Sequence, residues 1–70
     1  QIQLALVLEL RGRVREALVA AQAATTDEPS NWSGWLILSR LQAEAGHPVA
    51  SLTAYRRSRS LNPRSPLFSQ

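Results

Sequence analysis

The feature that most constrains the fold is the similarity of the chain to itself at an offset of 34 residues. At this offset two pairs of helix-breaking residues coincide, since Gly12 falls on Gly46 and Pro29 on Pro63. Small and apolar residues also coincide: Ile2/Leu36, Leu4/Leu38, Ala5/Ser39, Val7/Leu41, Ala17/Ser51, Leu18/Leu52, Ala20/Ala54 and Ala24/Ser58. Because the matches fall on breakers and on expected core positions, the sequence predicts two successive copies of one structural unit.

Each unit is predicted to consist of a helix, a turn and a second helix. In the second unit, Asn31 or Ser33 can cap a helix that runs to about Ala45. Gly46 supplies the left-handed conformation that closes such a helix. Pro48 fits the first turn of the following helix, where its missing N–H leaves no hydrogen bond unmade.

The ends of the second helices are marked by proline. The second helix of the second unit is expected to reach about Leu61, because Pro63 disfavours helical geometry in the residue before it. In the first unit the same plan places Gly12 in the turn, a helix over 14–26 and Pro29 as the terminator. The sequence therefore predicts an all-α chain of about four helices.

Side-chain spacing predicts how the helices of the second unit pack. One stripe follows the spacing i, i+3, i+4, i+7, and a partner stripe lies on the second helix. Small Ser39 and Ser51 are expected to let these helices approach closely, while Trp35 and Tyr55 fill the neighbouring core. The two stripes are Trp35, Leu38, Ser39 and Gln42, and Ser51, Tyr55 and Ser58.

These residues resemble the signature of the tetratricopeptide repeat (TPR) family over nearly the whole chain. The second unit matches it at Trp35, Leu38, Ser39, Gly46, Ser51, Tyr55, Ser58, Leu61 and Pro63, and the first at Leu4, Ala5, Leu8, Gly12, Ala17, Ala21, Ala24 and Pro29. Gln42 replaces the signature tyrosine, and Asp27 occupies the position in the first unit that corresponds to Leu61 in the second. These two differences imply looser packing between the repeats at those points. The resemblance implies a right-handed superhelix of antiparallel hairpins. Its units would be 1–31, with the first helix truncated at its start, and 32–65, followed by 66–70 as a third unit's beginning or a tail.

Composition excludes several classes of site and function. The chain has 70 residues and no cysteine, so disulfides are excluded, and His47 stands alone without a carboxylate cluster that would complete a zinc site. No apolar run approaches the roughly 18 residues that cross a bilayer, so membrane insertion of this segment is not expected. The five carboxylates are scattered and the three glycines isolated. We therefore expect no catalytic residue, metal or cofactor, and we interpret His47 as a surface capping residue.

The TPR resemblance implies a partner-binding groove along the first helix of each unit. By register that groove contains Leu6 and Glu9 from the first unit and Ser33, Leu36, Ile37 and Arg40 from the second. Family members that grip a terminal carboxylate use lysine and asparagine, but Leu36 and Arg40 stand at the matching places. An apolar or helical protein ligand is therefore expected here, unless these side chains contact neighbouring repeats instead.

The chain has a net charge of +3, and a basic patch is expected at the end of the last helix. The patch consists of Arg56, Arg57, Arg59 and Arg64. These arginines can offset the negative end of the helix dipole on a solvated face. An acidic protein or lipid head group is an alternative partner. Nucleic acid is not expected, because binding surfaces for it combine more charge with aromatic platforms.

The sequences of residues 31–41 and 55–68 also resemble the soluble TPR tails of bacterial O-antigen ligase/polymerase-type membrane proteins. This resemblance implies a soluble domain attached to a bacterial inner-membrane protein. Two functions therefore remain open at the level of sequence. The chain is either a protein–protein interaction scaffold or an accessory tail that packs on its parent protein or on a second copy of itself.

Overall fold

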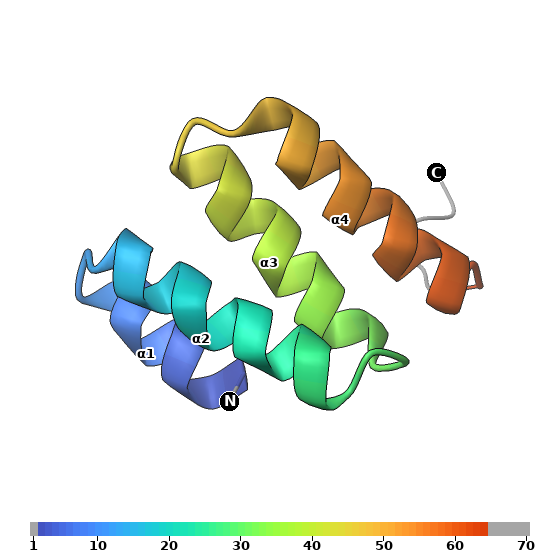
Figure 1. Ribbon diagram of the computed structural model, residues 1–70, viewed down its shortest axis with the longest axis horizontal. Helices are drawn as coiled ribbons and strands as arrows, with labels where there is room; N and C mark the ends of the chain where they lie inside the picture. Colours follow the sequence, from blue (N-terminus) through green and yellow to red (C-terminus); the bar gives the residue numbers. More distant parts are fainter. Residues whose placement is uncertain (1, 65–70) are drawn as a thin grey trace.

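The computed structural model describes residues 2–64, and in this part of the chain the regular secondary structure is helical, with no strand (Figure 1). This confirms the prediction of an all-α chain of about four helices. The predicted 66–70 segment lies outside the described residues. The four helices are α1 (Ile2–Leu10), α2 (Val14–Asp27), α3 (Trp32–Glu44) and α4 (Pro48–Leu61).

The two glycine turns have the same geometry, as the repeat predicts. Gly12 and Gly46 both have positive φ, 75° and 82°. In each turn the next residue donates a backbone hydrogen bond five residues back: Arg13 N to Leu8 O at 2.9 Å and His47 N to Gln42 O at 2.8 Å. This pattern is that of a Schellman helix end, in which glycine adopts the left-handed conformation without strain. Each pair of helices is thereby folded back into a hairpin.

Asn31, and not Ser33, caps α3. Its side-chain oxygen accepts a hydrogen bond of 3.1 Å from the backbone N–H of Ser33. The indole N–H of Trp35 donates to the carbonyl oxygen of Pro29 at 2.8 Å, so the linker between the hairpins is held against the first turn of α3. Pro48 opens α4, as the sequence predicts.

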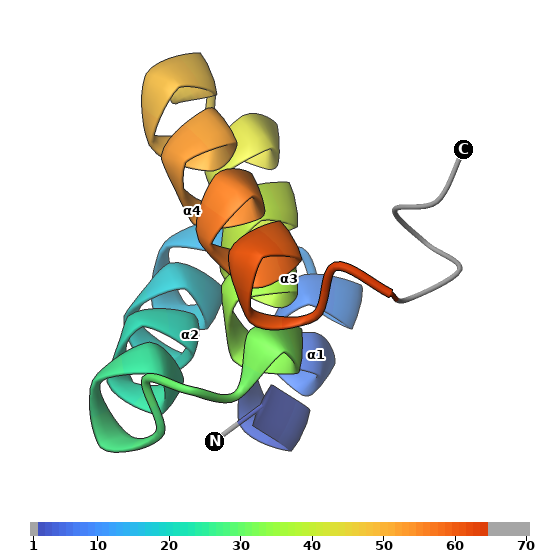
Figure 2. The same cartoon turned by 90° about the vertical axis from the view of Figure 1, so that its right-hand side faces the viewer.

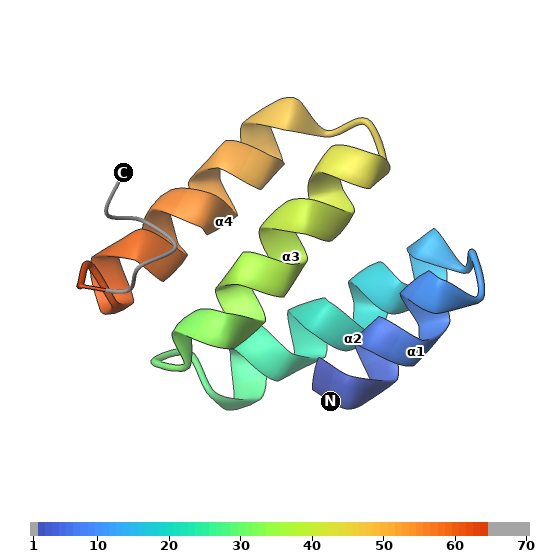
Figure 3. The ribbon, with the colours of Figure 1, turned by 180° about the vertical axis from the view of Figure 1, so that it is seen from behind.

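The helices stack in order, with α3 in the middle. The first hairpin (α1 and α2) and the second hairpin (α3 and α4) lie side by side in Figures 1 and 3. Helix α3 contacts the other three described helices, whereas α4 contacts α3 alone. Figure 1 shows α3 between α4 and the first hairpin, and in Figure 2 α4 lies in front of α3. The second hairpin is therefore attached to the first through α3.

The core is built mostly from small side chains, which allow the helices to approach closely. Leu41 is fully buried, and Leu38 is only 6% exposed. The half-buried ring of Trp35 packs against this core instead of lying within it. The buried apolar cluster consists of Ala5, Ala17, Ala20, Ala21, Leu38, Leu41 and Ala54.

Equivalent positions in the two hairpins are not equally buried. Leu4 is 52% exposed although its partner in the repeat, Leu38, is buried. Leu52 is 48% exposed, and Tyr55, which was expected to fill the core, is half-buried. Within residues 2–64, α4 packs on α3 alone, so Tyr55 is only partly covered. Both outer surfaces of the stack therefore present apolar side chains.

Candidate docking pocket on the second hairpin

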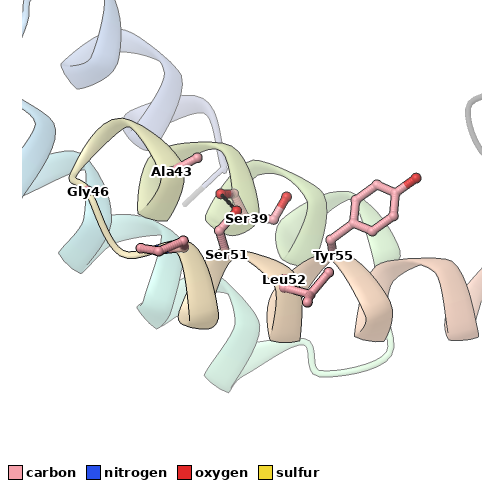
Figure 4. A pocket seen from close by; sticks show the side chains of 7 residues that line it. Ser39, Ala43, Gly46, Ser51, Leu52 and Tyr55 are labelled. Carbon is pink, nitrogen blue, oxygen red and sulfur yellow. Dashed lines mark hydrogen bonds between the residues drawn. The ribbon is translucent and has the colours of Figure 1, made fainter.

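A pocket of about 620 Å³ opens on the second hairpin, between α3 and α4 (Figure 4). Its wall is mainly apolar, and Tyr55 alone among the lining residues has a titratable side chain. Figure 4 shows side chains of both helices around the opening, with Gly46 in the connecting turn. The lining residues are Ser39, Ala43, Gly46, Pro48, Ser51, Leu52 and Tyr55.

Two serines join the helices beneath this pocket. The hydroxyl of Ser51 on α4 donates to the carbonyl oxygen of Ser39 on α3 at 2.7 Å (Figure 4). The hydroxyl of Ser39 in turn donates to the carbonyl oxygen of Leu36, also at 2.7 Å. Because both hydroxyls are satisfied within the hairpin, the small side chains contribute a closely packed floor without an unmade polar contact. The expected role of Ser39 and Ser51 in close approach agrees with this contact.

The pocket lies at positions that are covered in the first hairpin. Thirty-four residues before Ser39, Ser51 and Tyr55 stand three alanines that are at most 1% exposed. These alanines share one core cluster with Leu38 and Leu41 of α3. In the first hairpin, the same site is therefore filled by a helix. The three alanines are Ala5, Ala17 and Ala21.

The predicted partner groove along α1 and α3 contains an ion pair. Arg40 donates from Nε to Glu9 Oε2 at 3.1 Å and from Nη2 to Glu9 Oε1 at 2.5 Å. Glu44, one turn further along α3, lies 4.0 Å from Arg40 Nε. The Glu9 side chain is 16% exposed, and that of Arg40 is 53% exposed. One guanidinium thus lies between two carboxylates, and it is already paired within the chain.

The two carboxyl groups shift each other's pKa in opposite directions. A hydrogen bond from Glu44 lowers the pKa of Glu9, and the hydrogen bond and charge of Arg40 lower it further against the opposing effect of burial. The same hydrogen bond raises the pKa of Glu44. Glu9 therefore carries the charge that faces Arg40, and Glu44 is the carboxyl group that takes up a proton more readily.

The other predicted groove residues are apolar or small and lie half-buried along α1 and α3: Leu6, Ser33, Leu36 and Ile37. They contribute no further charge to this face. An acidic ligand would have to displace Glu9 from Arg40, so this face suits apolar or cationic groups better.

The predicted basic patch divides into two parts. The guanidinium of Arg57 lies over the ring of Trp35, 6.0 Å from its centroid, so this cation faces α3. Arg56 and Arg59 are exposed on α4, and Arg64 is exposed beyond the end of that helix. The aromatic contact of Arg57 could not be read from the charge pattern alone.

His47 stands at the start of α4, but its side chain makes no capping hydrogen bond there. Its Nδ1 atom instead lies 2.8 Å from Oε1 of Gln42, which is buried in α3. His47 is therefore an exposed residue at the N-cap position of α4, as interpreted from the sequence, but its side chain bonds Gln42 and does not cap the helix. Within residues 2–64, no group of three or more acidic or histidine side chains could hold a metal ion. No helix in that range is long and apolar enough to cross a bilayer.

The sequence interpretation did not identify the pocket as a site. The signal was present in the repeat itself, because positions 39, 51 and 55 match buried positions of the first unit. The sequence did not give the direction of stacking, which decides that, within residues 2–64, one side of the second hairpin packs on no other helix. In comparisons with known proteins, no family model, no curated protein and no solved structure matches this chain.

Proposed function

We propose that the chain is a protein–protein interaction module of the tetratricopeptide type, and that its hairpins form part of a right-handed superhelix. The 34-residue repeat supports this proposal, as do the two hairpins with matching glycine turns. The packing of α3 on both helices of the first hairpin supports it further. The proposal assigns no catalytic step, since the pocket gathers small and apolar side chains around a single tyrosine.

The proposed ligand is an amphipathic helix of another polypeptide, and the pocket between α3 and α4 is its docking site. A single observation carries this assignment: the corresponding positions of the first hairpin are buried beneath α3, whereas Leu52 and Tyr55 remain partly exposed. A helix docked there would remove apolar surface from water, which stabilises a complex by about 25 cal/mol for each Å² buried. Recognition would then follow the mode of a helix lying in an apolar groove.

The face along α1 and α3 is a second candidate surface for the same ligand. Glu9 and Glu44 outnumber Arg40 there, so a ligand residue that reaches this face would be apolar or cationic. Leu36→Asp and Arg40→Glu test this face separately from the pocket. Neither residue lines the pocket.

The test uses a synthetic peptide with the sequence of residues 31–45 as the probe, because this helix covers the corresponding site in the first hairpin. Titration of the labelled chain should shift the amide NMR signals of Ser51, Leu52 and Tyr55 in a saturable way. Leu52→Asp should weaken binding at least about tenfold. Val19→Asp is the matched control, because Val19 is 67% exposed and does not line the pocket. Binding that is unaffected by Leu52→Asp would exclude the pocket.

A further inference from the structure

The junction between the two hairpins has two halves. One half is the small-residue surface of the first hairpin, represented by Ala17 and Ala21, which are at most 1% exposed. The other half is α3, which contributes Leu38 and Leu41 to the same cluster. Gly34, at the start of α3, also faces the first hairpin, since a Cβ atom there would lie at an ordinary contact distance of 3.6 Å from Thr25 Cγ2. A small-residue surface on one hairpin thus holds a leucine-bearing helix of the next.

Both halves of this junction occur a second time in the chain. The pocket repeats the small-residue half at Ser39 and Ser51, and the larger Tyr55 stands at the position of Ala21. Helix α1 repeats the leucine-bearing half, because Leu4 and Val7 stand 34 residues before Leu38 and Leu41. Leu4 and Val7 are 52% and 45% exposed, whereas their partners in the repeat are 6% and 0% exposed. The chain therefore presents an open pocket and, on α1, the kind of helix that fills such a pocket.

The charged residues of the junction also indicate what fits the pocket. Inside the chain, one glutamate of α1 meets an arginine and a glutamate of α3. If α1 of a second copy lay on the pocket as α3 lies on the first hairpin, every one of these charges would be replaced by an apolar side chain. Leu10, which is 87% exposed, would be among those covered. The replacements are Glu9 by Ala43, Arg40 by Leu6 and Glu44 by Leu10.

We propose that the chain associates with itself head to tail, with α1 of one copy docked in the pocket between α3 and α4 of another. This inference rests on the proposed function of the pocket as a helix-binding site, and it names the partner. In such a contact apolar side chains stand at the three positions of Glu9, Arg40 and Glu44, which avoids the cost of desolvating those charges, and Arg59 stands at the position of Thr25. Because the two surfaces differ, an assembly of any length keeps a free pocket at one end and a free α1 at the other. It therefore grows as an open-ended polymer.

The first test uses variants that each block one surface. Leu4→Asp places a charge on α1, and Leu52→Asp places one in the pocket. Wild-type chain should show a mass that rises with concentration in sedimentation, and either variant alone should associate at least about tenfold more weakly. An equal mixture of the two should form a 1:1 dimer and stop there, because it offers one intact α1 and one intact pocket. Val19→Asp should associate as the wild type does.

The second test checks the register of the contact. Ala43→Glu and Leu6→Arg recreate, between two copies, the pair that Glu9 and Arg40 make within one. Each change alone should weaken association, since it places an unpaired charge in the contact. The double variant should recover most of the association, and the recovered part should weaken with added salt. Circular dichroism confirms that each variant keeps its helices, and Val7→Asp replaces Leu4→Asp if the latter unfolds.

Two results overturn the proposal: a wild-type chain that remains monomeric at every concentration, or a mixture of blocked variants that remains monomeric. The mixture of blocked variants would also fail to form a 1:1 dimer if two copies met through a symmetric contact of one surface with itself. The peptide of residues 31–45, titrated into Leu4→Asp, separates this failure from that of the proposed function. If the peptide still binds, only self-association is excluded. If it does not bind, the pocket is not a helix-binding site and both proposals fail.

Discussion

The hydroxyl of Ser58, near the end of α4, donates a hydrogen bond of 2.8 Å to the carbonyl oxygen of Trp32, the first residue of α3. Ser58 is fully buried, so this bond is shielded from water. The bond links α4 to α3 at the end of the second hairpin that lies opposite the Gly46 turn. Ser51 makes the corresponding bond to Ser39 nearer the turn. Two serine hydroxyls therefore hold α4 in position against α3, and with it one wall of the pocket.

Ser58→Ala should lower the free energy of unfolding by about 1 kcal/mol, the usual net contribution of one intramolecular hydrogen bond. The change removes the donor and leaves the carbonyl of Trp32 within the helix. Urea unfolding measures the loss. Ser60→Ala serves as the control, because Ser60 is exposed on the same helix, and it should leave stability unchanged. Equal effects of the two substitutions would contradict a structural role for the Ser58 bond.

Alanine should have opposite effects at Gly46 and Gly34. At Gly46 there is space for a Cβ atom, but φ is +82°, so Gly46→Ala should destabilise the chain by roughly 1 kcal/mol. At Gly34 the backbone is helical, and the nearest atom to an added Cβ lies at an ordinary 3.6 Å. Gly34→Ala should therefore stabilise the chain by roughly 0.5 kcal/mol through helix propensity. Thermal unfolding of both variants tests this contrast of sign.

The repeat made the helices and turns predictable because their signals are local. Gly12, Gly46 and Pro48 each act on the backbone of their own turn, so the boundaries lay within about two residues of those observed. Four residues of the two predicted stripes, Leu38, Ser39, Gln42 and Ser58, are buried, because their spacing is likewise a local signal. Burial at the outer surfaces did not follow, because it depends on which neighbour is present. Leu4 and Tyr55 have core-type spacing in the sequence, yet both are partly exposed.

Side-chain pairings were the least predictable part of the candidate site. The Glu9–Arg40 contact joins residues 31 positions apart, so no local pattern announces it. The contact of His47 with Gln42 depends on the fold of the glycine turn. The sequence analysis instead assigned Glu9 and Arg40 to the partner-binding groove and interpreted His47 as a capping residue. Only the packing of α3 on α1 shows that Arg40 already has a partner.

Leu41→Ala should abolish cooperative unfolding of the chain. Leu41 is fully buried, and such a change typically costs 2–5 kcal/mol. A core of this size supplies no more than about 3–5 kcal/mol of net stability, so most of the population would unfold. Far-ultraviolet circular dichroism against temperature measures the effect. Leu52→Ala is the matched control, because its side chain is 48% exposed, and it should keep a clear transition.

The Glu9–Arg40–Glu44 group should respond to substitution at Glu44. Because the hydrogen bond from Glu44 is the largest cause of the lowered pKa of Glu9, Glu44→Ala should raise that pKa towards its usual value. Glu44→Gln keeps a hydrogen-bond donor and should leave it low. Carboxyl-carbon NMR titration measures both. The contribution of Glu9 to stability is present at neutral pH and is lost as pH falls through its lowered pKa. The pKa of Glu44 is raised, so its contribution is present at low pH and is lost as pH rises through that pKa. A Glu9 pKa unchanged by Glu44→Ala would show that Arg40 alone sets it.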